Sequence, residues 1–297
     1  MRIAITGASG FIGSHLQRSL EADGHTVLPV SRSAGAPGTV RWDPAAGELD
    51  ATALEGLDGI VHLAGEGIAD KRWTPARKAA ILESRRAGTT LLAGALASLS
   101  EKPPVLVSGS AIGFYGDRGD EELTEASGPG DDYLAEICTT WEAATAAAEE
   151  AGIRVAHIRT GIVLGAGGAL GKMLPLFKLG VGGRLGPGTQ WMSWVALADE
   201  VAAIRFLLEH PVRGPVNLTA PNPVTNREFT KVLGSVVHRP TLLPVPKFGP
   251  KLLLGGELAE LLLFASQRVL PSALLEAGYQ FRHPTLESAL RDLVEAR

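Results

Sequence analysis

Three glycines near the N-terminus constrain this 297-residue chain more than any other feature. Residues 6–13 read Thr-Gly-Ala-Ser-Gly-Phe-Ile-Gly, between an apolar run of strand length and a segment of helical period. Such a loop must turn sharply and bring backbone close to a ligand, which suits residues without a side chain at Gly7, Gly10 and Gly13. The free N–H groups and the positive dipole end of the following helix favour phosphate. The context therefore predicts a dinucleotide-binding loop rather than an ordinary strand-to-helix turn.

Apolar runs of strand length alternate with segments of helical period over the first half of the chain. Strands are expected near residues 3–5, 27–30, 59–63, 105–108 and 155–158, and helices near 12–22, 75–99, 132–151 and 199–208. Strands without polar alternation, separated by helices, are typical of a parallel sheet covered on both faces. The predicted fold class is therefore α/β, a Rossmann doubly wound parallel sheet with a small C-terminal substrate lobe.

The regular alternation fades after Gly165, where glycine-rich and proline-rich stretches begin. We expect a Rossmann domain over residues 1–164 that is completed by about 190–220. Residues 165–189 and 221–297 are expected to form the smaller substrate lobe and C-terminal helices.

Net charge, cysteine content and the lengths of apolar stretches indicate which classes of partner the protein has. The formal net charge of −4 gives no global attraction for nucleic acid or for an anionic membrane, although a local basic patch remains open. The single cysteine, Cys138, excludes an intrachain disulfide and a cysteine-rich zinc site, and we expect no metal. The apolar stretch at 252–264 is too short and too charged to span a bilayer. We expect a cytoplasmic protein with a small-molecule substrate, no nucleic-acid partner and no membrane partner.

The end of the second expected strand indicates which dinucleotide binds. An NAD site usually has an acid about 20 residues after the glycine loop, to bind the ribose hydroxyls. Here the strand ends in Ser31 and Arg32, and no acid lies between Asp23 and Asp43. Arginine suits a 2′-phosphate through charge-assisted hydrogen bonds, and serine can add a donor. The alternative is a solvated loop charge, and we favour NADP(H).

Small residues after His62 mark a second candidate contact. Leu63, Ala64 and Gly65 would let the adenine-ribose half of a cofactor lie against backbone, and tight packing is the alternative. His62 itself is expected to be structural.

These segments together resemble the short-chain dehydrogenase/reductase superfamily in its extended form. The nearest likeness is the NAD-dependent epimerase/dehydratase-like branch, often labelled cell-division-inhibitor homologues. The resemblance covers nearly the whole chain and is carried by residues 6–13, 30–32, 63–66, 83–85, 110–117, 141–142, 159–165, 190–194, 270–271 and 278–281.

The resemblance implies an NADP(H) site and a homodimer, since extended members are often dimers. It implies cofactor contacts from Gly7, Gly10, Phe11, Ile12, Gly13, Ser31, Arg32, Leu63 and Ala64, and it places the turn Gly161–Val163 along the nicotinamide. Arg85 falls near the position of an active-site asparagine, where its guanidinium could reach a cofactor phosphate or a substrate anion. An arginine on a helix surface is the alternative.

The catalytic pair of the superfamily is missing. Extended members use a tyrosine and a lysine four residues later, and the lysine lowers the pKa of the tyrosine. Alignment of the helix that should carry this pair places Cys138 at the tyrosine position and Glu142 at the lysine position. Such a pair cannot reproduce the chemistry, because a carboxylate raises the pKa of a thiol. Burial as a small apolar residue is the alternative for Cys138, and Glu142 as a proton carrier is a hypothesis.

The family's serine corresponds to Ser110, with Ser108 as the other candidate because the following loop is one residue longer than usual. Trp191 and Trp194 could flank a flat substrate or pack in a core.

These sequence features are compatible with two functions. The first is an NADP(H)-dependent oxidoreductase or epimerase acting on a small substrate, nucleotide-linked ones included. The second is a non-catalytic NADP(H)-binding regulator that senses redox state, which the missing tyrosine–lysine pair would favour.

Overall fold

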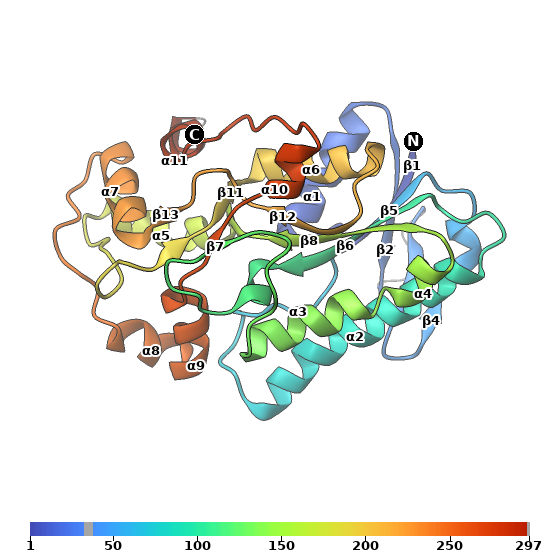
Figure 1. The fold of residues 1–297 in the computed structure, drawn as a ribbon, viewed down its shortest axis with the longest axis horizontal. Helices are drawn as coiled ribbons and strands as arrows, with labels where there is room; N and C mark the ends of the chain where they lie inside the picture. The colour runs from blue at the N-terminus through green and yellow to red at the C-terminus, as the bar shows by residue number, and fades with distance from the viewer. Residues whose placement is uncertain (33–37, 296–297) are drawn as a thin grey trace.

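The computed structural model describes residues 1–32 and 38–295, and an eight-stranded sheet forms its centre (Figure 1). All neighbouring strands are parallel except the antiparallel pair β3–β4 at one edge. The strand order is β12 (Gly214–Leu218), β8 (Arg154–Thr160), β6 (Val105–Ala111), β5 (Gly59–His62), β1 (Arg2–Thr6), β2 (Thr26–Ser31), β3 (Val40–Asp43) and β4 (Glu48–Leu49). The predicted α/β fold class is confirmed. Because the chain moves outward in opposite directions on the two sides of β1, the carboxyl ends of β1 and β5 flank a switch point where ligands of such sheets bind.

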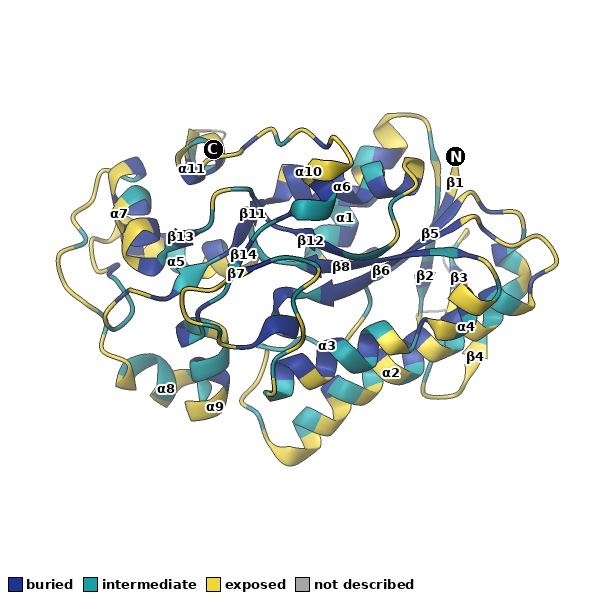
Figure 2. Cartoon of the chain, viewed as in Figure 1, coloured by how far each residue is buried: buried dark blue, intermediate teal, exposed yellow. Residues whose placement is uncertain are grey.

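Helices cover both faces of the sheet (Figure 1). Helices α1 (Phe11–Ala22) and α6 (Leu197–Glu209) lie on one face, with α2 (Pro75–Ser98), α3 (Tyr133–Ala143) and α4 (Ala146–Glu150) on the other. Alternate residues of β1 serve the two layers, since Ile3 and Ile5 pack with α1 and α6 whereas Ala4 packs with α2. Both layers bury most side chains of the central strands β1, β5, β6 and β8, as Figure 2 shows, whereas β2 is mostly half-buried and β4 at the edge has no buried residue.

The helix expected over residues 132–151 is instead two helices, α3 and α4. The break lies at Ala144 and Thr145. The hydroxyl of Thr145 donates to the carbonyl of Glu142 at 2.8 Å and lies 2.9 Å from His157 Nε2, so it ties the break to β8. A threonine hydroxyl that bonds nearby backbone competes with the helical pattern.

The C-terminal lobe is built from short elements around a separate apolar core. It contains β9 (Ile162–Leu164) paired with β11 (Trp194–Ala196), β10 (Trp191–Met192) paired with β13 (Val224–Thr225), and β14 (Arg268–Val269) paired with β7 (Glu122–Leu123). Its core is enclosed by α5 (Gly168–Lys178), α7 (Asn226–Val236) and α11 (Leu286–Glu295). The chain between α7 and α11 forms α8 (Phe248–Leu254), α9 (Gly256–Ala259), a π-helical turn at Glu260–Phe264 and α10 (Ser272–Glu276), which packs on β12 of the main sheet. Two 3₁₀ turns, Ala51–Leu54 and Ile112–Tyr115, complete the chain. The expected domain boundaries stay a prediction.

In the part of the chain that the structure describes, no helix has both the length and the hydropathy needed to cross a bilayer. The apolar stretch at 252–264 is divided among the end of α8, α9 and the π-helical turn.

Candidate functional site

The glycine loop lies at the carboxyl end of β1 and is too tight for side chains. Gly7 has φ +71°, and a Cβ there would lie 3.0 Å from the backbone of Leu63 and Ala64. A Cβ on Gly13 would lie 2.2 Å from the carbonyl oxygen of Gly7. Helix α1 begins at Phe11, and its N-cap, Gly10, provides no side-chain cap. The first N–H groups of α1 are therefore available to an anion.

A buried hydrogen-bond chain holds the backbone opposite this loop. Thr6 Oγ1 accepts from the N–H groups of Leu63 at 3.1 Å and Ala64 at 3.2 Å, so its own proton is directed to His62 Nδ1 at 2.7 Å. His62 then donates from Nε2 to Thr89 Oγ1 at 2.9 Å. Burial, with the charge of Arg85 adding to it, lowers the pKa of His62 to about 4. His62 is a neutral structural residue that joins β1, β5 and α2.

A cleft of about 940 Å³ opens beside the glycine loop, at the ends of β2 and β5 and along the first half of α2. Seven of the predicted cofactor residues line it: Gly7, Gly10, Ser31, Arg32, Leu63, Ala64 and Gly65. The other six, Phe11, Ile12, Gly13, Arg85, Gly161 and Val163, are outside its lining. The cleft therefore gathers the residues expected for the adenosine and phosphate half of a dinucleotide.

At the far end of the cleft, the exposed Arg32 follows β2 directly. Asp43 also lines this end, but its Oδ1 accepts from the N–H groups of Ala45 and Ala46 at 3.1 and 3.4 Å. Asp43 is thus engaged with its own turn, and among the residues that line the cleft Arg32 provides the basic side chain.

The catalytic candidates Ser110 and Glu142 are in direct contact. Ser110 Oγ donates to Glu142 Oε1 at 2.7 Å. Glu142 also forms a two-pronged ion pair with Arg159, with both N–O distances 2.9 Å. The two charged side chains are only 13% and 5% exposed. Strand register brings the three residues together, because Ser110 on β6 pairs with Arg159 on β8 and α3, which contains Glu142, packs over β6.

Arg159 extends this contact into a longer network. Its Nη1 donates to the hydroxyl of Tyr115 at 3.0 Å, which donates to Asn217 Oδ1 at 2.7 Å. Asn217 Nδ2 in turn donates to the carbonyl of Leu270 at 2.9 Å. Sequence reasoning missed Arg159 and Asn217 as members of the site. The signal was present in Arg159, because a charged side chain at the end of a buried strand requires a partner.

Burial bears on two alternatives from the sequence: whether Cys138 is catalytic or packed, and whether Ser108 or Ser110 is the family's serine. Cys138 is 3% exposed, its thiol donates to the carbonyl of Ala111 at 3.5 Å, and burial, followed by the charge of Glu142, raises its pKa to about 12. This is the geometry of a packed apolar residue. Ser108 is fully buried, and its hydroxyl has no partner among the described residues, so Ser110 is the serine that contacts Glu142.

Arg85 is a buried cation between the cleft and the Ser110 region. Its Nη1 donates to the carbonyls of Glu66 at 2.9 Å and Ile81 at 3.3 Å, and its guanidinium lies 4.7 Å from the ring centre of Trp141. A Cβ on Gly65, in the cleft wall, would lie 3.1 Å from Arg85 Cζ. Across the residues described, no carboxylate forms an ion pair with Arg85. Its charge is therefore available to an anion at this border.

The tryptophans of the glycine-rich segment differ in exposure. Trp194 is fully buried and donates from Nε1 to the carbonyl of Asn222 at 3.1 Å, which is core packing. Trp191 is half-buried, donates to Asp120 at 2.8 Å and carries the guanidinium of Arg268 over its ring. Both rings are thus engaged with the protein.

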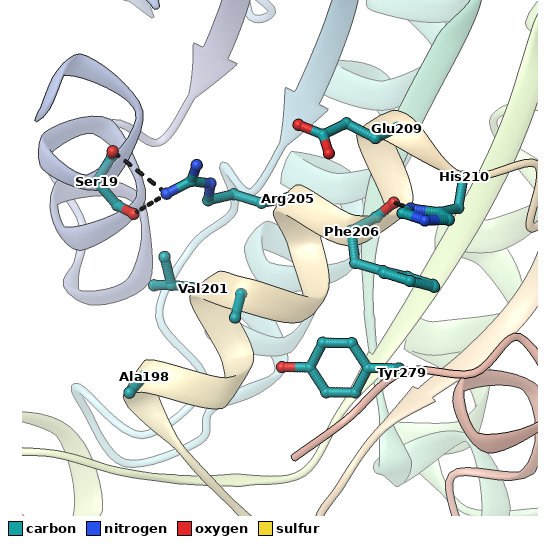
Figure 3. Close-up of a pocket in the computed structure, with 9 residues that line it drawn as sticks. Ser19, Ala198, Val201, Arg205, Phe206, Glu209, His210 and Tyr279 are labelled. Atoms are coloured by element: carbon teal, nitrogen blue, oxygen red, sulfur yellow. Dashed lines mark hydrogen bonds between the residues drawn. The ribbon is translucent and has the colours of Figure 1, made fainter. Parts of the chain in front are cut away.

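A second, smaller hollow of about 300 Å³ lies on the α1–α6 side of the sheet (Figure 3). Arg205 crosses it to Ser19, and Phe206 stacks on His210 with ring centres 3.7 Å apart. It contains none of the predicted site residues. Over residues 1–32 and 38–295, no group of three histidine, cysteine, aspartate or glutamate side chains could hold a metal ion.

Comparison with known proteins gives two sequence-profile matches. The profile of the NAD dependent epimerase/dehydratase family matches residues 3–219, and a domain of unknown function, DUF1731, matches residues 245–293. The epimerase family protein Mb2239 of Mycobacterium bovis is 45% identical over 97% of this chain and 96% of that protein.

Solved structures show the same likeness. The crystal structure of human epimerase family protein SDR39U1 (isoform 2) with NADPH is 35% identical, with a TM-score of 0.92 over the full length of both chains. The nucleoside-diphosphate sugar epimerase from Corynebacterium glutamicum is 39% identical with a TM-score of 0.82, over all of this chain and 59% of that one.

Proposed function

Because this chain belongs to the NAD dependent epimerase/dehydratase family, we propose that it binds NADP(H) and acts as an oxidoreductase or epimerase on a small substrate. The observation that carries the proposal is the cleft itself, which joins an uncapped helix start, a glycine loop without room for side chains and Arg32 at its far end. The human relative with a TM-score of 0.92 was crystallised with NADPH, which supports the choice of cofactor.

The residues present fit this cofactor. The N–H groups of Phe11, Ile12 and Gly13 would hold the pyrophosphate, while Gly10, whose N–H donates to the carbonyl of Gly7 at 2.9 Å, would shape the turn beneath it. Leu63, Ala64 and Gly65 would lie along the adenosine. Ser31 and Arg32 would hold the 2′-phosphate. Gly161, Val163 and Arg85 would border the nicotinamide half. When bound, the cofactor supplies or accepts a hydride.

The protein's own part in the chemistry is the handling of a proton. The Ser110 hydroxyl donates to Glu142, which leaves its oxygen free to accept from a substrate hydroxyl. During oxidation of an alcohol, the substrate proton would pass to Ser110 Oγ as the proton of Ser110 passes to Glu142, and the reverse would accompany reduction of a carbonyl. Arg159 positions Glu142, and Cys138 has no part in this chemistry.

Cofactor choice is tested by the affinities for NADPH and NADH of the wild type and of Arg32→Asp. The wild type should bind NADPH more tightly, and the variant should lose about tenfold or more of that affinity, because a charge-assisted contact is replaced by repulsion. Arg291→Asp on α11 is the control, since the ion pairs of its exposed side chain with described residues are to Glu287 and Glu295 of the same helix. A wild type that prefers NADH would contradict the assignment.

Activity is tested by nicotinamide absorbance with a panel of carbonyl compounds and alcohols that includes nucleotide-linked sugars. Once a substrate is found, Ser110→Ala should lower kcat by about 10²-fold or more while NADPH affinity is retained, because the proton route is cut. Ser108→Ala, whose hydroxyl has no partner among the described residues, is the matched control. Tight NADPH binding without turnover across the panel would contradict an enzymatic function.

A further inference from the structure

Charge is unevenly distributed in the C-terminal lobe. Two segments, residues 165–198 and 229–256, contain no aspartate or glutamate, although the chain as a whole has a net charge of −4. Together they contain seven lysines and arginines: Lys172, Lys178, Arg184, Lys231, Arg239, Lys247 and Lys251. The net charge of the whole protein therefore conceals a basic region.

The two acid-free segments lie side by side. The N–H of Val245 donates to the carbonyl of Arg184 at 2.8 Å, and the N–H of Gly186 donates back to Val245 at 3.0 Å. Arg239 Nε donates to the carbonyl of Lys178 at 2.9 Å. Helices α5, α7 and α8 gather at the left end of the molecule in Figure 1. Residues 168–189 of the first segment and all of the second thus form one region at one end of the protein, which we call the basic end.

The basic end also exposes most of the large apolar side chains that face solvent. Leu242 and Leu243 are 86% and 80% exposed, between Pro240 and Pro244, and α8 presents exposed residues along its length (Figure 2). Among the eleven exposed large hydrophobic residues of the described chain, eight belong here: Leu176, Leu179, Val181, Leu242, Leu243, Phe248, Leu252 and Leu253. Apolar exposure concentrated in this way marks an interaction surface.

We propose that the basic end docks on the surface of an anionic phospholipid membrane. Leucine and phenylalanine side chains that project beside lysines suit the boundary between headgroups and acyl chains, where they enter the apolar layer while the cations meet lipid phosphates. Lys247 and Lys251 share Glu260, whereas the other five cations form no ion pair with a carboxylate in residues 1–32 and 38–295.

Other occupants fit less well. A second copy that docks through the same region would bring two sets of like charges together. Nucleic acid would match the lysines but would leave the leucines uncovered. The docking is peripheral, and it is independent of the chemistry proposed for the cleft.

Vesicle flotation with the full chain tests the docking. The protein should bind phosphatidylcholine vesicles that contain about one third phosphatidylglycerol more than tenfold better than pure phosphatidylcholine vesicles, and salt should weaken the binding. Leu242→Ser/Leu243→Ser and Lys172→Glu/Lys178→Glu should each lower binding by about tenfold or more, because one removes the apolar contact and the other reverses two charges.

Matched controls are Leu275→Ser on α10 and Lys102→Glu, which exchange exposed residues outside the basic end and should leave binding unchanged. Circular dichroism confirms that each variant is folded. Equal binding to both vesicle types, or no binding to either, would overturn the proposal. It would also be overturned if sedimentation showed self-association that Leu242→Ser/Leu243→Ser abolishes while vesicle binding persists.

Discussion

The ion pair between Glu142 and Arg159 is the most constrained contact of the candidate site. Taking two charges out of water is costly, and the pair persists because each partner also hydrogen-bonds a neutral group, Ser110 on one side and Tyr115 on the other. The position at which the resemblance to the extended family would place a lysine holds an anion instead, and its counter-charge comes from Arg159 on β8.

Glu142→Gln should leave the guanidinium of Arg159 buried without its carboxylate. We expect the free energy of unfolding to fall by about 3 kcal/mol or more in urea titrations. Glu136→Gln, on the exposed side of the same helix, is the control and should change it by less than about 0.5 kcal/mol. Equal stability of Glu142→Gln and the wild type would show that the pair contributes nothing.

Glu200 is a second buried acid, and no cation of residues 1–32 and 38–295 forms an ion pair with it. Thr160 donates to its Oε1 at 2.9 Å, while Oε2 has no partner among the described residues. Burial raises its pKa from 4.5 to about 8. The folded protein therefore keeps a proton that the unfolded chain releases between these values, and the free energy of unfolding must fall as pH rises through this window.

Glu200→Gln removes this titration. Between pH 5 and pH 8 the wild type should lose up to roughly 1 kcal/mol of stability per pH unit relative to the variant. Urea unfolding of both proteins at several pH values measures the difference. Parallel curves for the two proteins would mean that Glu200 is ionised in the folded state.

At the scale of elements, the loop between β1 and α1 gives the sharpest test of the cleft. Gly13→Ala would place a methyl group 2.2 Å from the carbonyl of Gly7 and must displace the loop. We expect NADPH affinity to fall by about tenfold or more, since the N–H groups lose their common direction. Gly94→Ala on α2 meets open space and should leave affinity unchanged while stabilising the helix by up to about 1 kcal/mol. Calorimetric titration with NADPH compares the two variants.

The sheet could be predicted because its strands are buried on both faces and are separated by helical periods. The sequence does not predict the short strand β12, because Gly214, Pro215 and Asn217 interrupt the apolar run that would indicate a strand. The division of the helix expected at 132–151 depends on Thr145 meeting His157, a contact that no local pattern reveals.

The cofactor half of the site could be predicted better than the catalytic half. The glycine loop and Ser31–Arg32 are local signals, and they meet at the switch point that the topology dictates. The Ser110–Glu142–Arg159 contact joins three elements that are distant in sequence. It depends on strand register, which sequence alone did not provide.

At the scale of the whole molecule, Asp199 ties the C-terminal segment to the main sheet layer. Its buried carboxylate accepts from the N–H groups of Arg282 at 2.7 Å and His283 at 2.9 Å, just before α11. The Tyr279 hydroxyl donates to the carbonyl of the same residue at 3.0 Å. The acid at the start of α6 thus joins the Rossmann layer to α11, which packs on α7.

Asp199→Asn would direct an amide NH₂ at one of these N–H groups. We expect a loss of about 1–3 kcal/mol in stability and faster proteolysis between α10 and α11. Glu287→Gln, an exposed acid of α11 that pairs with Arg291 of the same helix, is the control and should have little effect. Unchanged proteolysis in Asp199→Asn would show that other contacts hold the segment.

The first residue of α1 has a consequence for how the two lobes move. A Cβ on Gly165, Gly167 or Gly168 would lie within 3.1 Å of the Phe11 ring, so this ring fills the space over the turn that leads into α5. The start of α1 and the entry to the C-terminal lobe are therefore in direct contact through one ring. A ligand that immobilises α1 lowers the entropy still to be lost at this turn, so we expect occupancy of the cleft to slow amide hydrogen exchange in α5.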